Sequence, residues 1–273
     1  MPRKKKKHSS EKLIASIIFV ALAAVIIVAM YFLFPTMRQR AEEADQSARS
    51  AANSQVVAKN VTAPMAGDGL LTLHFISVGQ ADSIFIEFPT GNNMLIDASE
   101  KSTADTVISY VSALGVSAID YVLLTHQDAD HAGGMADIFK AFEVKNALRP
   151  SVYSTYKSYA LPTDFNIGYE SSCPSSTATY YNYLKAVYEE PGCAWEAFNK
   201  DSDIDFVATS GGTEYRCTLD FLTPTAAVGS IKYKKENNFS PIMILEYGGV
   251  KIMLTGDAEK EVEQELIAYY GDD

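Results

Sequence analysis

Apolar and polar positions follow two periods after residue 70, and together they predict a domain of mixed strands and helices. Alternating or short apolar runs predict strands at 71–76, 83–88, 94–97, 119–124 and 144–148. Apolar residues three and four apart predict helices at 103–114 and 133–142. Three successive strands followed by alternating helix and strand indicate a layered α/β sandwich.

The later part of the chain is less regular until strands resume. Residues 150–212 read as an insertion with one helix, at 176–189, and eight of the sixteen tyrosines lie between Tyr153 and Tyr188. These tyrosines could stack on the bases of single-stranded DNA, but only Lys157 and Lys185 lie among them, so packing is favoured. Further strands are predicted at 215–222, 242–247 and 250–254, and a helix at 258–270.

The N-terminal region has a different pattern. Residues 13–34 carry no charge and a single Ser, and as a helix they would span roughly 33 Å, which predicts one transmembrane helix in contact with the lipid bilayer. The basic segment 1–12 places the N-terminus in the cytoplasm by the positive-inside rule. Residues 35–69 read as a stalk, and 70–273 as a domain on the extracellular side of the cell membrane.

Charge narrows the range of functions. The formal net charge is −11, yet residues 1–12 hold six of the 23 basic residues and one of the 34 acidic ones. The remainder, with 17 basic against 33 acidic residues, has a net charge of −16. Such a body does not hold nucleic acid by bulk charge, because phosphate binding depends on Lys and Arg. Contact with a phosphodiester must be local or mediated by a metal.

The candidate chemistry lies in one short segment, directly after a predicted buried strand. His126, Asp128, Asp130 and His131 fall within six residues, and the chain has only four histidines. Period-two spacing sends the first three side chains to one side, and the turn into the next helix can bring His131 to the same cavity. Imidazole and carboxylate ligands suit zinc or manganese, and two such ions can hold an attacking hydroxide. The alternative is a solvated acidic loop with incidental histidines.

This segment resembles the HxHxDH metal motif of the metallo-β-lactamase fold, with Asp128 in place of the second histidine. Three further stretches match the same pattern: residues 78–83 resemble a VGQGDS signature, residues 94–98 resemble an LIDAG strand, and Asn237-Asn238-x-Ser240 precedes a TGDAE stretch at 255–259. Together they resemble the metallo-hydrolase domain of the ComEC family of competence proteins, which is implicated in DNA uptake. The resemblance covers about residues 70–270.

The resemblance implies an αββα sandwich and a site for two divalent metal ions, zinc or manganese. His126 and Asp128 would bind one ion, Asp130 and His131 the other, and Asp257 would bridge both, with Asp130 as the catalytic carboxylate. Asp97 would orient the ligands. Supporting roles fall to Asp82 and Gln80, and to Asn238 and Ser240, which either face the site or fix a turn. Without the resemblance, Asp257 reads equally well as the N-cap of a helix.

Two departures from the family pattern stand out. Asp128 replaces a nitrogen ligand by a harder oxygen, which should shift preference toward manganese or magnesium. Relatives continue to a GHHGS-type segment that supplies another histidine, and this chain has none after His131. We therefore expect a C-terminally incomplete sandwich with an unpaired sheet edge; the alternative is a degenerate domain.

Three functions remain open. The first is a membrane-anchored, extracytoplasmic metal-dependent nuclease or phosphodiesterase that acts on single-stranded DNA or another phosphodiester through a metal-activated hydroxide. The second is a catalytically inactive binding or scaffold domain. The third is a lactone or β-lactam hydrolase, which the ligand residues alone do not distinguish from the first. Cys173, Cys193 and Cys217 leave one thiol over in any pairing, and Cys173 with Cys193 could close a loop.

Overall fold

The computed structural model describes residues 60–64, 69–157, 160–162, 165–166 and 174–271. The chain divides into two units, Met1–Ala51 and Ala52–Asp273, and all described residues belong to the second. The transmembrane helix predicted at 13–34 and the basic segment 1–12 lie outside the described residues. Within those residues, no helix is both long and apolar enough to cross a membrane.

The first of two sheets has six strands in the order β2-β3-β4-β5-β6-β7. Its strands are β2 (Thr72–Phe75), β3 (Ile84–Glu87), β4 (Asn93–Ile96), β5 (Ala118–Leu123), β6 (Glu143–Arg149) and β7 (Ala194–Ala197). The first three pair antiparallel, and β4 to β7 pair parallel. The carboxyl ends of four parallel strands therefore share one edge, which is where α/β sheets bind ligands.

The second sheet has five strands in the order β1-β8-β9-β10-β11. Its strands are β1 (Asn60–Pro64), β8 (Ile204–Ser210), β9 (Thr213–Phe221), β10 (Met243–Tyr247) and β11 (Val250–Leu254). All neighbours are antiparallel except β1 and β8. Strands β2 and β11 each pair on one side only within the described part of the chain, so each lies at a sheet edge.

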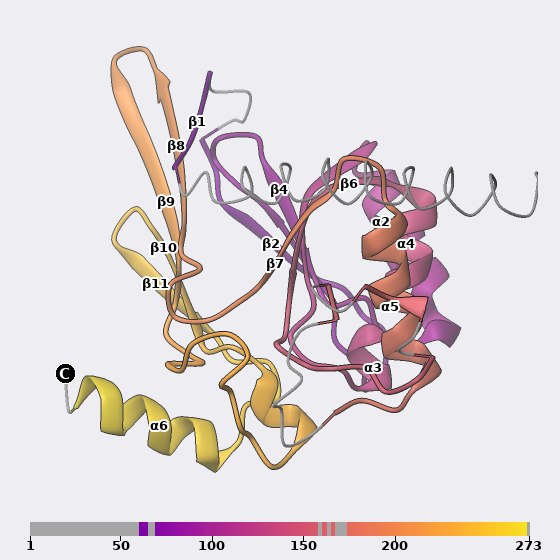
Figure 1. The fold of residues 1–273 in the computed structure, drawn as a ribbon. Helices are drawn as coiled ribbons and strands as arrows, with labels where there is room; N and C mark the ends of the chain where they lie inside the picture. Colours follow the sequence, from indigo (N-terminus) through magenta and orange to yellow (C-terminus); the bar gives the residue numbers. More distant parts are fainter. Residues whose placement is uncertain (1–59, 65–68, 158–159, 163–164, 167–173, 272–273) are drawn as a thin grey trace, which may run out of the picture. The chain divides into compact units, whose positions relative to one another are not determined.

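Helices cover the outer face of the six-stranded sheet (Figure 1). They are η1 (Lys101–Thr103), α2 (Ala104–Ala113), α3 (Ala129–Ala132), α4 (Met135–Ala141) and α5 (Ala178–Glu189); η3 (Glu236–Phe239) and α6 (Lys260–Tyr270) follow later. One core cluster packs the helices on that sheet, with Val107, Ile138 and Leu184 fully buried. A second cluster joins the two sheets through residues such as Leu123 and Phe206. The layers are thus helix, sheet, sheet, and α6 lies beyond the end of β11 (Figure 1).

Three strands form where none was predicted. β7 and β8 lie within the expected insertion at 150–212, yet one forms the edge of the first sheet and the other is internal to the second. β1 lies within the expected stalk and pairs with β8 from Asn60↔Asp205 to Pro64↔Thr209. The partner of β1 is more than 140 residues away, so no local pattern could reveal this pairing.

The tyrosine-rich region packs inward. Tyr180 and Tyr183 are fully buried and Tyr181 is 7% exposed, so a stacking platform built from these α5 residues is wrong. The hydroxyl of Tyr180 donates to the carbonyl of Val152, and that of Tyr183 to the carbonyl of Leu148. These rings fasten α5 to the end of β6.

The two described cysteines are buried in different clusters. Cys193 belongs to the core beneath the helices and Cys217 to the core between the sheets. Burial, with the charge of Asp220, raises the pKa of the Cys217 thiol to about 12, so it stays protonated. Cys173 lies outside the described residues, and its pairing with Cys193 stays a prediction.

Candidate metal centre

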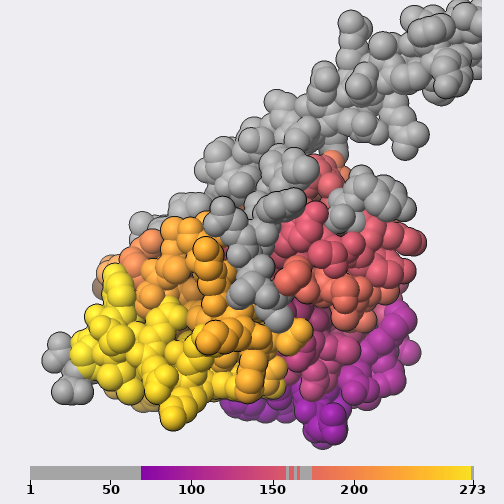
Figure 2. All heavy atoms as spheres, turned by 60° about the horizontal axis from the view of Figure 1, so that its bottom comes forward, coloured from indigo at the N-terminus to yellow at the C-terminus, as the bar shows by residue number. Residues whose placement is uncertain are grey.

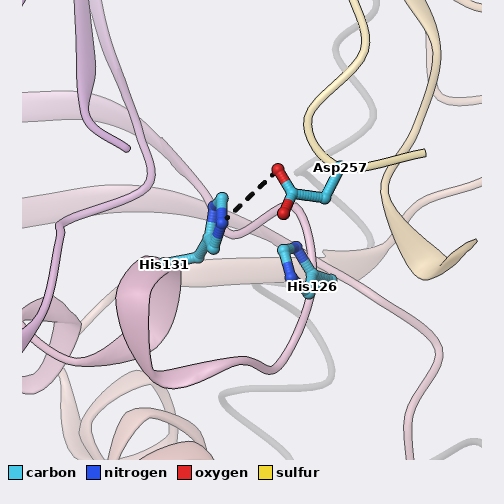
Figure 3. A group of neighbouring side chains, drawn as sticks. All are labelled: His126, His131 and Asp257. Carbon is cyan, nitrogen blue, oxygen red and sulfur yellow. Dashed lines mark ion pairs between the residues drawn. The ribbon is translucent and has the colours of Figure 1, made fainter. Parts of the chain in front are cut away.

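Three side chains from different parts of the chain meet at the shared edge of the sheets. His126 follows β5, His131 lies in α3, and Asp257 follows β11. Each offers one ligand atom, and these atoms all lie within 4.8 Å of one another. Figure 3 shows the carboxylate of Asp257 directed toward His131, with His126 beside them. The cluster therefore joins the six-stranded sheet to the five-stranded one.

His131 is held by Asp97, the residue that follows β4. Its Nδ1 donates a 2.7 Å hydrogen bond to Oδ2 of Asp97, and its Nε2 lies 3.6 Å from Oδ1 of Asp257. Burial lowers the pKa of His131, but the hydrogen bond and the charge of Asp97, with Asp257 and Asp130 nearby, outweigh it and raise that pKa to about 9. The metal-free site thus attracts positive charge.

His126 is fully buried and held at the same ring position. Its Nδ1 lies 3.1 Å from Oγ1 of Thr125 and 3.2 Å from Oγ of Ser240. Its Nε2 has no hydrogen-bond partner among the described residues, and Oδ2 of Asp128 lies 3.6 Å away. A buried imidazole nitrogen without a partner is costly unless something else binds it.

These observations fit a divalent metal ion. Both histidines engage Nδ1 in hydrogen bonds and leave Nε2 for the cluster, as metal-binding histidines usually do. Asp257 and Asp128 place carboxylate oxygens near the two Nε2 atoms. A mixed nitrogen and oxygen set suits zinc or manganese, and the raised pKa of His131 shows the excess of negative charge that a cation would balance.

Asp130 is also a predicted metal ligand. Asp130 is half-buried on α3 and is not one of the three residues whose ligand atoms converge. Its charge still raises the pKa of both His131 and Asp82. Asp82 is exposed, and partial burial raises the pKa of its carboxyl group while His131 lowers it. Asp82 thus belongs electrostatically to the site, and a ligand role for Asp130 stays a prediction.

The supporting residues divide between the site and the fold. Oγ of Ser240 touches His126 and accepts a hydrogen bond from the backbone N–H of Asp257 at 3.2 Å. Asn238 instead fixes the start of α6: its Oδ1 accepts from the N–H of Glu259, and its Nδ2 donates to Glu261. Gln80 is exposed and makes no side-chain hydrogen bond within the described part of the chain.

Two glycines allow the loop after β5 to fold tightly beneath the site. A Cβ on Gly134 would lie 2.1 Å from the carbonyl oxygen of Ala98, and one on Gly133 would lie 2.4 Å from that of Ala129. Across the site, Gly256 has φ +48° and lies against Ser240 and Thr125. Close backbone approach is therefore required at both positions.

A cleft of about 280 Å³ lies between residues of the two sheets. Its wall includes Asp97, Thr125 and Gly256, which are neighbours of His126, His131 and Asp257, although these three residues do not line it. Phe75 from β2 and Met253 from β11 line the outer part and are 69% and 56% exposed. The cleft is thus acidic at its inner end and apolar at its mouth.

Sequence reasoning missed Thr125 as a site residue. Its Oγ1 donates a 2.7 Å hydrogen bond to Oδ2 of Asp97, and its backbone N–H donates to Oδ1 at 2.8 Å. A Thr carries no metal-ligand signal, and only its position beside His126 could have drawn attention to it. Asp97 itself has φ +56°, a left-handed conformation that Asp tolerates better than most residues.

Comparison with known proteins relates part of the chain to one superfamily. Residues 76–165 match the model of the Metallo-beta-lactamase superfamily. Over 209 residues, the chain is 28% identical to ComE operon protein 3 of Bacillus subtilis (strain 168), and the match covers 70% of this chain and 23% of that protein. The chain thus spans less than a quarter of the length of this distant relative.

Solved metallo-β-lactamases are also similar, at low identity. The Cronobacter sakazakii enzyme with a HARLDQ motif is 16% identical with a TM-score of 0.38, over 67% of this chain and 55% of that one. The FEZ-1 enzyme of Legionella gormanii is 15% identical with a TM-score of 0.37, over 75% and 71% of the two chains.

Proposed function

We propose that this chain, of which residues 76–165 match the Metallo-beta-lactamase superfamily, is a metal-dependent hydrolase whose substrate is a phosphodiester, with single-stranded DNA as the leading candidate. The observation that carries the proposal is the convergence of His126, His131 and Asp257, with a buried Nε2 of His126 that lacks a partner. The distant similarity to ComE operon protein 3, together with the resemblance of the sequence motifs to the ComEC family, supports the choice of substrate.

The proposed division of labour follows from the contacts. His126, His131, Asp257 and Asp128 would hold divalent metal, and Asp130 is the candidate for a second ion. A bound ion would lower the pKa of water and stabilise charge on the reacting oxygens. Asp97 holds His131 through Nδ1, and Ser240 links His126 to the backbone of Asp257. No Ser or Cys nucleophile is needed.

The negative charge of the site should make the binding of an anionic substrate depend on divalent cations. Asp82, Asp97, Asp128 and Asp257 surround the cluster, and a phosphodiester anion would be repelled by them. Divalent cations should therefore be needed for substrate binding as well as for hydrolysis. The apolar mouth of the cleft, with Phe75, suits an uncharged part of the substrate.

The decisive experiment uses the full chain in detergent. We expect manganese or zinc to confer hydrolysis of single-stranded DNA and of a simple phosphodiester, and EDTA to abolish it. Asp257→Asn should lower activity by about a hundredfold or more, because a ligand loses its charge while its shape is kept. Asp220→Asn, which changes a half-buried carboxylate in β9, should leave activity unchanged.

Other outcomes would redirect the proposal. Hydrolysis of a lactam or lactone without phosphodiester cleavage would assign the third function. Stoichiometric metal binding without any hydrolysis would favour a binding or scaffold domain. Undiminished cleavage of DNA in excess EDTA would refute a metal-dependent mechanism.

We also propose that residues 13–34 anchor the chain in the cell membrane, with residues 1–12 in the cytoplasm and the hydrolase domain outside. The support is the uncharged run of 22 residues behind a basic segment. In intact cells, added protease should digest the domain and leave a short membrane-bound fragment. Complete protection of the domain until cells are lysed would contradict this orientation.

A further inference from the structure

We infer that Thr125 is a positioning residue that extends the influence of Asp97 to His126, so that one carboxylate sets the proton positions of both histidines. The inference rests on the proposed metal site and concerns how that site is prepared before an ion binds. It depends on four short contacts around two buried side chains, Thr125 and Asp97, each 2% exposed.

The carboxylate of Asp97 accepts three hydrogen bonds. Oδ1 accepts from the backbone N–H of Thr125 at 2.8 Å, while Oδ2 accepts from Oγ1 of Thr125 and from Nδ1 of His131, both at 2.7 Å. A carboxylate is an acceptor only, so both side-chain partners must donate. His131 therefore carries a proton on Nδ1.

The single proton of Thr125 determines what it can offer His126. A hydroxyl has one O–H, and the short contact with Asp97 uses it. Oγ1 of Thr125 thus presents a lone pair to Nδ1 of His126, which lies 3.1 Å away. Two facing lone pairs would repel, so Nδ1 of His126 must donate. The neutral ring then has its lone pair on Nε2, the atom directed at the cluster.

Ser240 accommodates this arrangement from the other sheet. Its Oγ accepts from the N–H of Asp257 and lies 3.2 Å from Nδ1 of His126. A hydroxyl oxygen has two lone pairs, so it can accept from both groups. Ser240 alone could also donate to Nδ1 and favour the opposite tautomer. The contact between Thr125 and Asp97 removes that choice.

Both histidines already have the tautomer that metal binding requires, so the ion does not have to change it. With Nδ1 protonated in both rings, neither ring needs tautomer exchange before its Nε2 can bind a cation, although His131, whose pKa is about 9, must first release its Nε2 proton. Residues that orient ligands in this way typically affect metal affinity by about 10–100-fold when they are changed. The sequence offers no direct sign of this role, because Thr125 looks like the last residue of a strand.

The test compares three variants by two measurements. Thr125→Val removes the hydroxyl and keeps the shape, Thr125→Ser keeps the hydroxyl, and Thr218→Val removes a hydroxyl that donates to Asp220 in β9. The first measurement is ¹⁵N spectroscopy of the metal-free, histidine-labelled full chain from about pH 7 to about pH 10, which distinguishes the two tautomers. The four histidines keep the spectrum assignable. The second is zinc or manganese affinity by competition with a chelator.

We expect His126 to be protonated on Nδ1 in the parent chain and in Thr125→Ser. Thr125→Val should shift the ring toward Nε2–H and lower metal affinity by about 10–100-fold, while Thr218→Val changes neither. Nε2–H in the parent chain, or unchanged tautomer and affinity in a folded Thr125→Val, would overturn the inference. If Thr125→Val does not fold, Thr125→Ser and the parent tautomer still decide it. Because the tautomer is measured without metal or substrate, a failure of the proposed function leaves this result interpretable.

Discussion

At the scale of single residues, His131 connects the stability of the metal-free domain to pH. Its pKa in the folded chain is about 9, above the ordinary value of 6.5, because the contact with Asp97 outweighs burial. A raised pKa means that the folded state binds the proton more tightly than the unfolded state. The protonated ring therefore stabilises the fold fully below pH 6.5, and this contribution disappears as the pH rises through about 9.

This pH dependence can be measured by urea unfolding in EDTA. Between about pH 6 and about pH 10, the free energy of unfolding should fall by up to about 3 kcal/mol through His131. His131→Asn keeps a donor for Asp97 but cannot titrate. The unfolding free energy of this variant should therefore fall less over the same pH range. Equal pH dependence in both proteins would show that the contact with Asp97 does not raise the pKa of His131.

Asp97 provides a second prediction at this scale. Asp97→Asn replaces one carboxylate oxygen by an NH₂ group, so the single remaining oxygen cannot accept all three hydrogen bonds that Asp97 accepts. We expect metal affinity to fall by about 10–100-fold and the pKa of His131 to move back toward its ordinary value. Both changes are accessible to chelator competition and to a pH titration followed by NMR. A variant that lost neither would contradict the role of Asp97.

At the scale of elements, the site depends on the close fit between the β5–α4 connection and the segment after β4. The N–H of Ala98 donates to the carbonyl of His131, and the N–H of Gly134 donates to that of Ser99. The N–H of Ser99 in turn donates to the carbonyl of Asp82. Three stretches that the sequence analysis singled out are thus held together by backbone contacts.

Gly134→Ala tests this fit. Its Cβ would lie 2.1 Å from a backbone oxygen, so the connection must move, and we expect a loss of about 3 kcal/mol in stability together with metal binding. Gly192→Ala is the matched control. Gly192 has φ +75°, but an added Cβ would meet no other atom within 4 Å, so the substitution should lower stability by about 1–2 kcal/mol and leave metal binding intact. Thermal unfolding and metal titration of both variants provide the comparison. Similar losses in both would contradict a packing origin.

The same elements show what the sequence could and could not reveal. The strands and helices around His126 and Asp97 were predicted to within a few residues, because apolar period and chemistry coincide there. In β8, Ile204, Phe206 and Ala208 are buried and alternate with more exposed residues, so a signal was present and was not recognised. The role of Thr125 could not be predicted, since it depends on which atom receives one proton.

At the scale of the whole domain, both sheets end in an edge strand that carries exposed apolar side chains. On β11, Val250 and Met253 are 62% and 56% exposed, and Phe75 at the end of β2 is 69% exposed. Unpaired edges of this kind promote association between chains.

This edge predicts the behaviour of residues 52–273 prepared without the N-terminal segment. Val250→Lys with Met253→Lys should reduce concentration-dependent association, measured by light scattering, and should leave metal affinity unchanged because neither residue touches His126, His131 or Asp257. Lys200→Glu, a charge change elsewhere on the surface, serves as the control. Association that persisted undiminished in the double variant would point to another surface.

The cluster joins elements that are far apart in the chain. In Figure 2 the C-terminal helix (yellow) and the segment near residue 235 (orange) lie on one face beside the magenta half of the domain. His126 and His131 belong to the half built on β5, while Asp257 and Ser240 come from the half built on β10 and β11. An ion bound by residues of both halves would hold the two halves together. Because the ion would bind only the folded domain, the melting temperature should rise with the logarithm of the free ion concentration once that concentration exceeds the Kd. The stability of the domain would then report how much metal its surroundings supply.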